Sequence, residues 1–162
     1  MSWGITVRTV LVCAILIVLH FTLRPLLGWR AGIDFMLIAL MFGSVRLRPG
    51  AAAVYGLLLG LVADSLSVST FGSSALAMTV VGYAASWLKA VFFADNLALN
   101  AFFLFLGKWL FDVIFVLAER RLSGWELVMQ LVAWSSLSAA ATALAGVLVL
   151  ALLRPLLEAR TA

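Results

Sequence analysis

Charged residues are scarce in this sequence, and so are the residue types that usually build reactive sites. Only 11% of its 162 residues are charged and 65% are hydrophobic, whereas soluble domains have about 25% and about 45–50%. One cysteine, one histidine and three prolines are present. The lone cysteine, Cys13, excludes a disulfide within the chain. This composition excludes a water-soluble fold and indicates an integral membrane protein.

The sequence lacks the common catalytic and metal-binding motifs. His20 and Cys13 lie seven residues apart on one apolar run, about 10 Å along a helix, too far for both to bind one metal ion. No H-E-x-x-H, G-x-S-x-G or phosphate-binding glycine loop occurs. We therefore expect a protein that is not an enzyme and has no cofactor. The net charge of +4 comes mostly from arginines near the ends of apolar runs, which suits membrane lipids better than nucleic acid.

Six apolar runs organise the chain. At about 20 residues per membrane-spanning helix, six spans leave no room for a separate soluble domain. We expect an all-α, polytopic integral membrane protein, a compact bundle of six transmembrane helices that forms one membrane domain over residues 1–162. The predicted spans cover residues 5–23, 32–45, 51–66, 73–88, 97–118 and 125–153.

Prolines and tryptophans suggest where the spans end. Arg24-Pro25 and Arg154-Pro155 are expected to end the first and last spans, because proline cannot continue the helical hydrogen bonding. Four tryptophans fall at predicted span ends, where an indole prefers the headgroup layer; they are Trp3, Trp29, Trp87 and Trp125. An even number of spans puts both termini on one side. A small excess of Lys and Arg favours the cytoplasm for that side.

Small residues recur along three of the predicted spans, and on the sixth span they are Ser135, Ala139, Thr142 and Gly146. Ala52, Gly56, Gly60 and Asp64 follow one another at i+4 spacing, which places them on one helix stripe. Such stripes allow close helix packing in lipid. This stripe could pack within the chain or form a groove for a partner's helix. The fourth span has a similar face made of Gly72, Ala75, Thr79, Gly82 and Ser86.

Asp34, Asp64, Lys108 and Asp112 are charged residues that fall within predicted spans. Lys108 and Asp112 are one helical turn apart in the fifth span, so they can neutralise each other. If the third and fifth spans run in the same direction, Lys108 could also reach Asp64. The pair could fix helix register or bind a partner or substrate. Asp34 opens the second span and is expected to cap that helix.

An ordered set of these residues resembles the MreD family of rod shape-determining membrane proteins, over about residues 32–118. The resemblance rests on Asp34-Phe35, on Gly56-xxx-Gly60-xxx-Asp64 followed by Phe71-Gly72, Leu76 and Tyr83, and on Asn96–Leu99 with Asp112. Lys108 departs from the family's pattern.

The resemblance implies a non-enzymatic component of the bacterial elongation machinery in the cytoplasmic membrane. MreD proteins associate with the single-pass protein MreC. With RodA and a transpeptidase penicillin-binding protein they belong to the complex that directs side-wall peptidoglycan synthesis alongside MreB. The candidate residues for partner contact or for an intramembrane polar role are Asp34, Gly56, Gly60, Asp64, Gly72, Tyr83, Lys108 and Asp112.

An alternative interpretation belongs to another functional class. Six short helices with small-residue faces also resemble the substrate-binding subunit of an energy-coupling-factor vitamin transporter, whose fold the MreD family is thought to share. Such a binder needs a cavity lined by aromatic and polar groups, and this sequence has few polar residues to provide one. An enzyme acting on a lipid-linked substrate is a third possibility, without a supporting set of residues.

Overall fold

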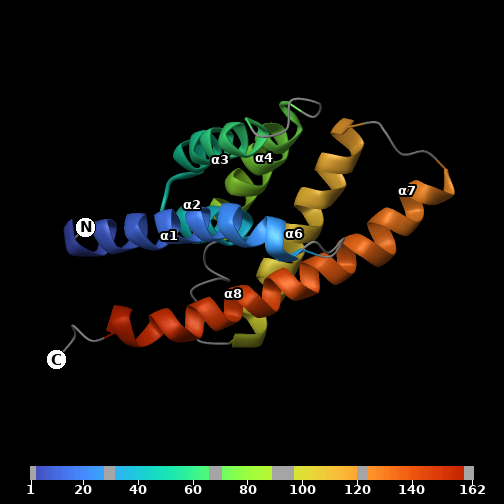
Figure 1. The fold of residues 1–162 in the computed structure, drawn as a ribbon. Coiled ribbons are helices and arrows are strands. Elements are labelled where there is room, and N and C mark those ends of the chain that lie inside the picture. Colours follow the sequence, from blue (N-terminus) through green and yellow to red (C-terminus); the bar gives the residue numbers. More distant parts are fainter. Residues whose placement is uncertain (1–2, 28–31, 66–70, 89–96, 120–123, 159–162) are drawn as a thin grey trace.

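The regular structure of the computed structural model is helical throughout the described residues, which are 3–27, 32–65, 71–88, 97–119 and 124–158 (Figure 1). The helices are α1 (Trp3–Leu27), α2 (Phe35–Ser44), α3 (Pro49–Asp64), α4 (Ser73–Trp87), α6 (Leu97–Glu119) and a long last helix. The last helix comprises α7 (Trp125–Met129), the π-helical segment η2 (Gln130–Trp134) and α8 (Ser135–Glu158). The all-α prediction is confirmed.

The predicted and observed helix ends differ most at the prolines. α1 continues through Pro25 to Leu27, and α8 continues through Pro155 to Glu158. The expectation that the two Arg-Pro pairs end these helices was therefore wrong by a few residues. Each proline removes one backbone donor, and apolar helices tolerate this loss by local adjustment. Trp29, Asn96, Arg30, Lys89, Arg120, Arg121 and Arg160 lie outside the described residues.

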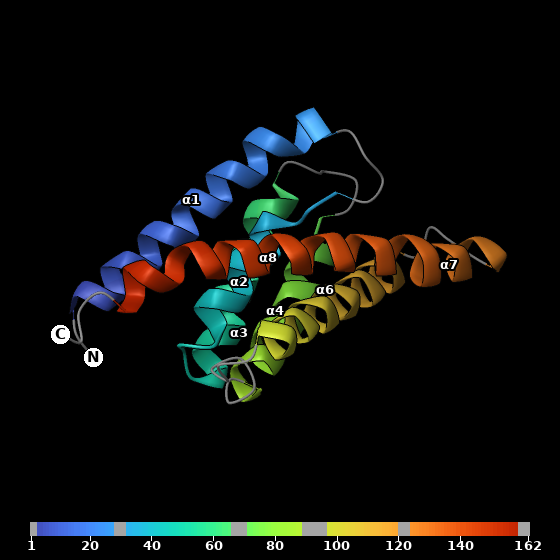
Figure 2. The same cartoon turned by 90° about the horizontal axis from the view of Figure 1, so that it is seen from below.

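α2 forms the centre of the bundle. All ten of its residues are buried, and it contacts α1, α3, α4, α6 and α8. In Figure 2, α8 passes across α2, and α3 lies next to α2. Its sequence is apolar on every side, as expected for a helix enclosed by protein. α2 is therefore the core around which the longer helices pack.

α3 and α4 form the most closely packed helix pair, and they lie side by side in Figure 1. A Cβ atom added to Gly56 would collide with the backbone of Met78, and one added to Gly60 would collide with the backbone of Ala75. From the other side, a Cβ on Gly82 would lie 2.8 Å from the carbonyl oxygen of Ala52. Glycine thus permits a backbone-to-backbone approach along this pair.

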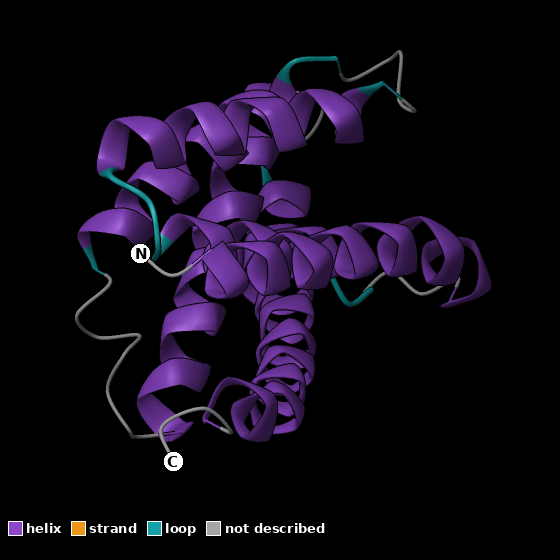
Figure 3. Ribbon diagram, turned by 90° about the vertical axis from the view of Figure 1, so that its left-hand side faces the viewer, coloured by secondary structure: helices purple, strands orange, loops and turns teal. Residues whose placement is uncertain are grey.

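The described loops between helices are short, and some helices cross one another (Figure 3) while others, such as α3 and α4, lie side by side (Figure 1). Two segments, Leu97–Glu119 and Trp125–Leu152, are long and apolar enough to cross a membrane. Val10–Thr22, which lies within α1, and the helices Phe35–Ser44 and Pro49–Asp64 are shorter apolar helical segments among the described residues. The last span contains η2, which the sequence did not reveal, and neither α7 nor η2 contains a buried residue.

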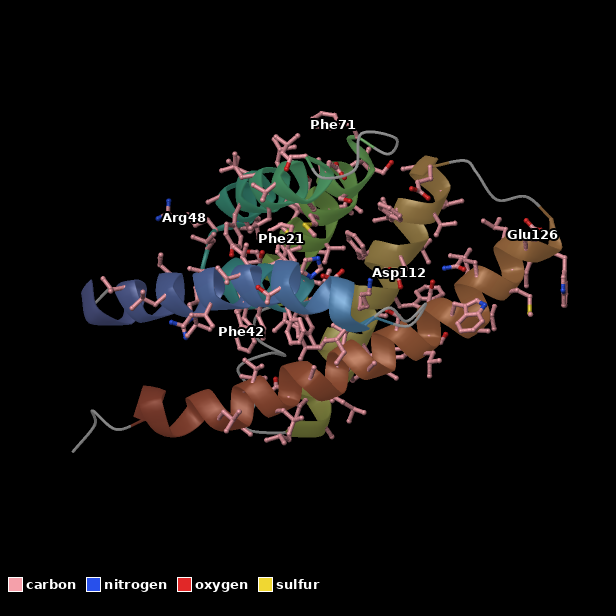
Figure 4. All side chains as sticks on the ribbon, in the orientation of Figure 1. Phe21, Phe42, Arg48, Phe71, Asp112 and Glu126 are labelled. Carbon is pink, nitrogen blue, oxygen red and sulfur yellow. The ribbon has the colours of Figure 1, made fainter. Side chains whose placement is uncertain are left out.

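The exposed helix faces of the described residues carry many large apolar side chains, as Figure 4 shows around the bundle. On α1, α3 and α8 they include Val10, Ile15, Val18, Val54, Leu58, Val62, Leu144, Leu148 and Leu152. Trp87 and Trp125, which were expected at span ends, are exposed at the end of α4 and the start of α7. Surfaces of this kind suit contact with lipid or with other membrane helices.

Candidate functional site

Four ionisable side chains from separate parts of the chain meet inside the bundle, and we call them the ion cluster. They are His20 from α1, Asp34 just before α2, and Lys108 and Asp112 from α6. Lys108 Nζ lies 2.6 Å from Asp112 Oδ1 and 3.3 Å from Asp34 Oδ2. His20 Nδ1 lies 3.5 Å from Asp34 Oδ1. Figure 4 labels Asp112 on α6.

The ion cluster is enclosed by protein. His20 and Lys108 are buried, and the side chains of Asp34 and Asp112 are 13% and 14% exposed. The ring of Phe111 lies 4.7 Å from Lys108 Nζ, so the ammonium group also faces an aromatic surface. Isolated charges are costly at this depth, and their mutual neutralisation makes their burial tolerable.

Asp34 is held in place by both its backbone and its side chain. Its Oδ1 accepts a hydrogen bond from the Leu37 amide at 3.1 Å, which caps α2 as the sequence predicted. Its own amide donates to Thr142 Oγ1 on α8, also at 3.1 Å. One residue therefore fixes the start of α2 against α8 while its remaining carboxylate oxygen faces Lys108.

Hydroxyl groups of α8 complete the polar surroundings. Besides Thr142, Ser138 Oγ donates to the carbonyl oxygen of Gly32 at 3.1 Å. These bonds join residues more than a hundred positions apart in the sequence. The polar interactions thus connect α1, the start of α2, α6 and α8 at one place in the bundle.

The partners of Lys108 differ in part from those predicted. The Lys108–Asp112 pair is present, but the suggested bridge from Lys108 to Asp64 was wrong. Asp34 takes that place, because α2 passes through the centre of the bundle and brings its N-terminus to α6. The sequence analysis expected Asp34 to cap α2 and included it among the candidates for a polar role, but it did not predict the contact with Lys108.

Asp64 has a separate role at the junction of α3 and α4. Its carboxylate is 1% exposed and accepts hydrogen bonds from the amides of Gly72, Ser74 and Ala75 at 2.9, 3.3 and 3.0 Å. Gly72 has a φ of +100°, a left-handed conformation that favours glycine. Asp64 and Gly72 therefore shape the N-terminus of α4 and do not contribute to the ion cluster.

Gly56 and Gly60 face α4 of the same chain. Of the two roles left open for this stripe, the structure shows packing within the chain, and the stripe is not available as a groove for a partner's helix. The small-residue face of α4 is used in the same way. There, Ser86 Oγ donates to the carbonyl oxygen of Leu47 at 2.7 Å.

Tyr83 differs from the other candidate residues because it is exposed on the bundle surface. Its side chain projects from α4 on the face that also carries Leu76, Val80 and Trp87. The rings of Tyr83 and Trp87 lie 6.4 Å apart, centre to centre. We call these four residues the α4 outer face.

His20 is the functional candidate that the sequence analysis missed. The sequence analysis considered it only as a metal ligand together with Cys13, yet it lies beside Asp34 in the ion cluster. A signal was present in the sequence, since Cys13, Leu16 and His20 follow helical spacing and all three are buried on α1. The helix face that carries them is therefore the one turned toward the core.

A small recess lies between α4 and α6. Its volume is about 40 Å³. It is lined by apolar residues and glycine, among them Met41, Val81, Phe103, Gly107 and Leu110. Pockets for small molecules usually measure about 300–1,000 Å³ and contain a few well-placed polar groups. The recess does not fit a nutrient-sized ligand.

The chain was also compared with known proteins. The sequence model of the rod shape-determining protein MreD matches residues 3–159. This match includes the ion cluster and the whole α3–α4 pair. No curated protein and no solved structure matches the chain.

Proposed function

Because the chain belongs to the MreD family of rod shape-determining membrane proteins, we propose that it is a non-enzymatic scaffold of the bacterial cell elongation complex. In this role it associates with MreC and with the peptidoglycan synthase formed by RodA and a transpeptidase penicillin-binding protein, and indirectly with MreB. It resides in the cytoplasmic membrane as six spans with both termini in the cytoplasm.

The main support for this proposal is that the charged side chains described above face the interior of the bundle. The ion cluster and Asp64 form their hydrogen bonds and ion pairs inside the bundle. The exposed faces of α1, α3 and α8 are mainly aliphatic. A protein built in this way supports recognition through helix surfaces within the membrane, where close packing and a few hydrogen bonds supply the association energy.

The α4 outer face is the surface that we propose for MreC. Tyr83 and Trp87 each carry a hydrogen-bond donor and are 47% and 69% exposed. Hydrocarbon cannot satisfy such donors, whereas a partner helix can, and aromatic residues often anchor protein interfaces. The aliphatic faces of α1, α3 and α8 offer no comparable groups among their large exposed side chains in the described part of the chain.

The first test is capture of the full chain after gentle solubilisation from cells that also produce MreC, RodA and the penicillin-binding protein. We expect the wild-type chain to retain MreC and the synthase. We expect the double variant Tyr83→Leu with Trp87→Leu to lose most of the MreC. The matched control is Leu144→Ala with Leu148→Ala on the exposed face of α8, which should retain it.

Two outcomes would contradict the proposal. If the folded wild-type chain captures none of these proteins, the proposed scaffold function is contradicted. If both double variants recover equal amounts of MreC, the α4 outer face is not the surface that contacts MreC. A vitamin recovered in stoichiometric amount would favour the transporter subunit, although the apolar recess between α4 and α6 gives that alternative no support.

A further inference from the structure

Trp109 is an exposed tryptophan in the middle of a helix that is long enough to cross a membrane. It lies near the midpoint of α6, Leu97–Glu119, which is one of the two segments with sufficient length and hydropathy. Its side chain is 37% exposed, and the described residues offer its indole N–H no hydrogen-bond acceptor. Tryptophan prefers the headgroup layer, and hydrocarbon cannot accept a hydrogen bond. The position therefore favours an acceptor from another molecule.

Trp109 shares one face of α6 with two exposed apolar side chains, Phe102 and Leu106. The three residues follow i, i+4, i+7 spacing, which places them on one side of a helix. Leu106 also lines the recess between α4 and α6. The exposed face of α6 therefore continues directly into that recess.

Small residues from both helices create the recess. Ala84 and Ala85 line it from α4, and Gly107 lines it from α6. Its volume of about 40 Å³ would hold a water molecule, but apolar cavities stay free of water. Because protein and lipid pack closely around such a space, an aliphatic group from outside the chain is the occupant that suits it.

The α4 outer face borders the recess on its other side. Ala84 and Leu88 line the recess, and each directly follows a residue of the α4 outer face, Tyr83 or Trp87. The recess thus lies between two exposed surfaces that both carry aromatic hydrogen-bond donors. A lipid tail could fill the recess but could not accept a hydrogen bond from Trp109, whereas a helix of another protein can do both.

We propose that one transmembrane helix of a partner protein lies over the recess, between the α4 outer face and Trp109. This helix places an aliphatic side chain in the recess and offers a hydrogen-bond acceptor, such as a serine, threonine, asparagine or glutamine oxygen, to the Trp109 indole. The assignment rests on the proposed function, because it takes the helix to be that of MreC. It adds α6 and the recess to the surface proposed for MreC and states the chemistry of the contact.

Fluorescence energy transfer between the full-length chain and full-length MreC in lipid vesicles measures their association. Trp109→Phe keeps an aromatic ring and removes the donor, and we expect it to weaken association about twofold to tenfold, the usual effect of one hydrogen bond. Trp125→Phe makes the same change at an exposed position on α7 and should leave association unchanged. Equal association of the two variants would overturn the assignment of Trp109.

The recess is tested by filling it. Ala84→Leu occupies the space from within the chain, and we expect it to weaken association about tenfold or more, because the side chain of the partner loses its place. Ala51→Leu makes the same change at an exposed position on α3 and should have no effect. Unchanged association of folded Ala84→Leu protein would overturn the role of the recess. If that variant does not fold, cross-linking decides.

Cross-linking in cell membranes identifies the molecule that covers this face. The photoreactive amino acid benzoylphenylalanine replaces Phe102 on α6 or, as a control, Trp125 on α7; both side chains are exposed. We expect the Phe102 position to cross-link to MreC and the Trp125 position not to do so. An adduct of the Phe102 position with lipid alone or with a second copy of this chain would overturn the proposal, as would equal MreC yields from both positions.

The results separate this inference from the proposed function. If the wild-type chain associates with MreC and the double variant Tyr83→Leu with Trp87→Leu does not, the α4 outer face is supported. If Trp109→Phe and Ala84→Leu then associate as the wild type does, the proposed function stands and the assignment of α6 and the recess is wrong.

Discussion

Lys108 is the residue on which the ion cluster depends most, because its ammonium group is shared by two carboxylates. Replacement by methionine keeps the length of the side chain and removes its charge. We expect Lys108→Met to destabilise the protein by about 3–5 kcal/mol, since breaking a buried pair leaves uncompensated charge. Adding Asp112→Asn should restore part of this loss. Thermal unfolding in detergent measures both effects.

The order of stabilities is the decisive result for the Lys108 pair. The double variant should lie between the wild type and the single variant, because Asp34 still lacks its lysine but retains the Leu37 amide and His20. A double variant less stable than Lys108→Met would contradict the pairing. A Lys108→Met protein as stable as the wild type would show that the ion cluster does not stabilise the fold.

Asp64 supports a second prediction at the scale of single residues. Asp64→Ala leaves the amides of Gly72, Ser74 and Ala75 without their acceptor. Because each buried unsatisfied donor costs about 1–3 kcal/mol, we expect a large loss of thermal stability. Asp64→Asn keeps one acceptor oxygen and should lose less. If the two variants were equally stable, the carboxylate would not be the cap of α4.

The residue contacts that could be predicted from the sequence are the local ones. Lys108 and Asp112 are one turn apart on a single helix, so their pairing follows from helix geometry. The capping role of Asp34 follows from its position before an apolar run. The contacts of Asp34 with His20 and Lys108 depend on how α1, the start of α2 and α6 cross, and helix periodicity contains no information about those crossings.

At the scale of helices, the glycines of the α3–α4 pair can be tested with a matched substitution. We expect Gly60→Ala to destabilise the protein by about 1–3 kcal/mol or more, because the new Cβ would collide with the backbone of Ala75. Gly50→Ala, at a position with nothing within 4 Å, should have little effect. Thermal unfolding of the two variants in the same detergent makes the comparison. Similar stability for both would show that α3 and α4 can separate without cost.

The sequence predicted the close approach of helices better than it predicted their partners. Small residues at i+4 spacing indicate that some backbone comes near, and the α3–α4 contact confirms that part. Whether the neighbour is a helix of the same chain cannot be read from the stripe alone. The helix ends at Pro25 and Pro155 and the π-helical turn η2 were missed, because they depend on local hydrogen bonding that composition does not specify.

For the whole molecule, the positions of the chain ends give a prediction about membrane topology. The start of α1 and the end of α8 lie at the same end of the molecule in Figures 1 and 2. We expect a fluorescent reporter that folds in the cytoplasm to be active when fused to either terminus. A periplasmic phosphatase reporter should be inactive at both. Reporters that place the two termini on opposite sides would contradict the six-span arrangement.

Composition alone was sufficient to predict an all-helical protein with apolar surfaces, because scarce charge and long apolar runs leave few other folds. It was insufficient to place α2 at the centre of the bundle. The second apolar run, residues 32–45, is short for a span, which left either local thinning of the bilayer or burial within the bundle to compensate. Its complete burial among five other helices is a property of the assembled structure, which the separate runs do not reveal.

The enclosure of α2 also has a consequence for biogenesis. Ten helical residues extend about 15 Å, roughly half the thickness of the hydrocarbon layer. A segment of this length cannot settle stably in a bilayer by itself as it leaves the ribosome. α2 must therefore reach its final position together with helices that are synthesised later, including α6 and α8. Nascent chains that stop before α8 should accordingly be recognised and degraded by membrane quality-control proteases.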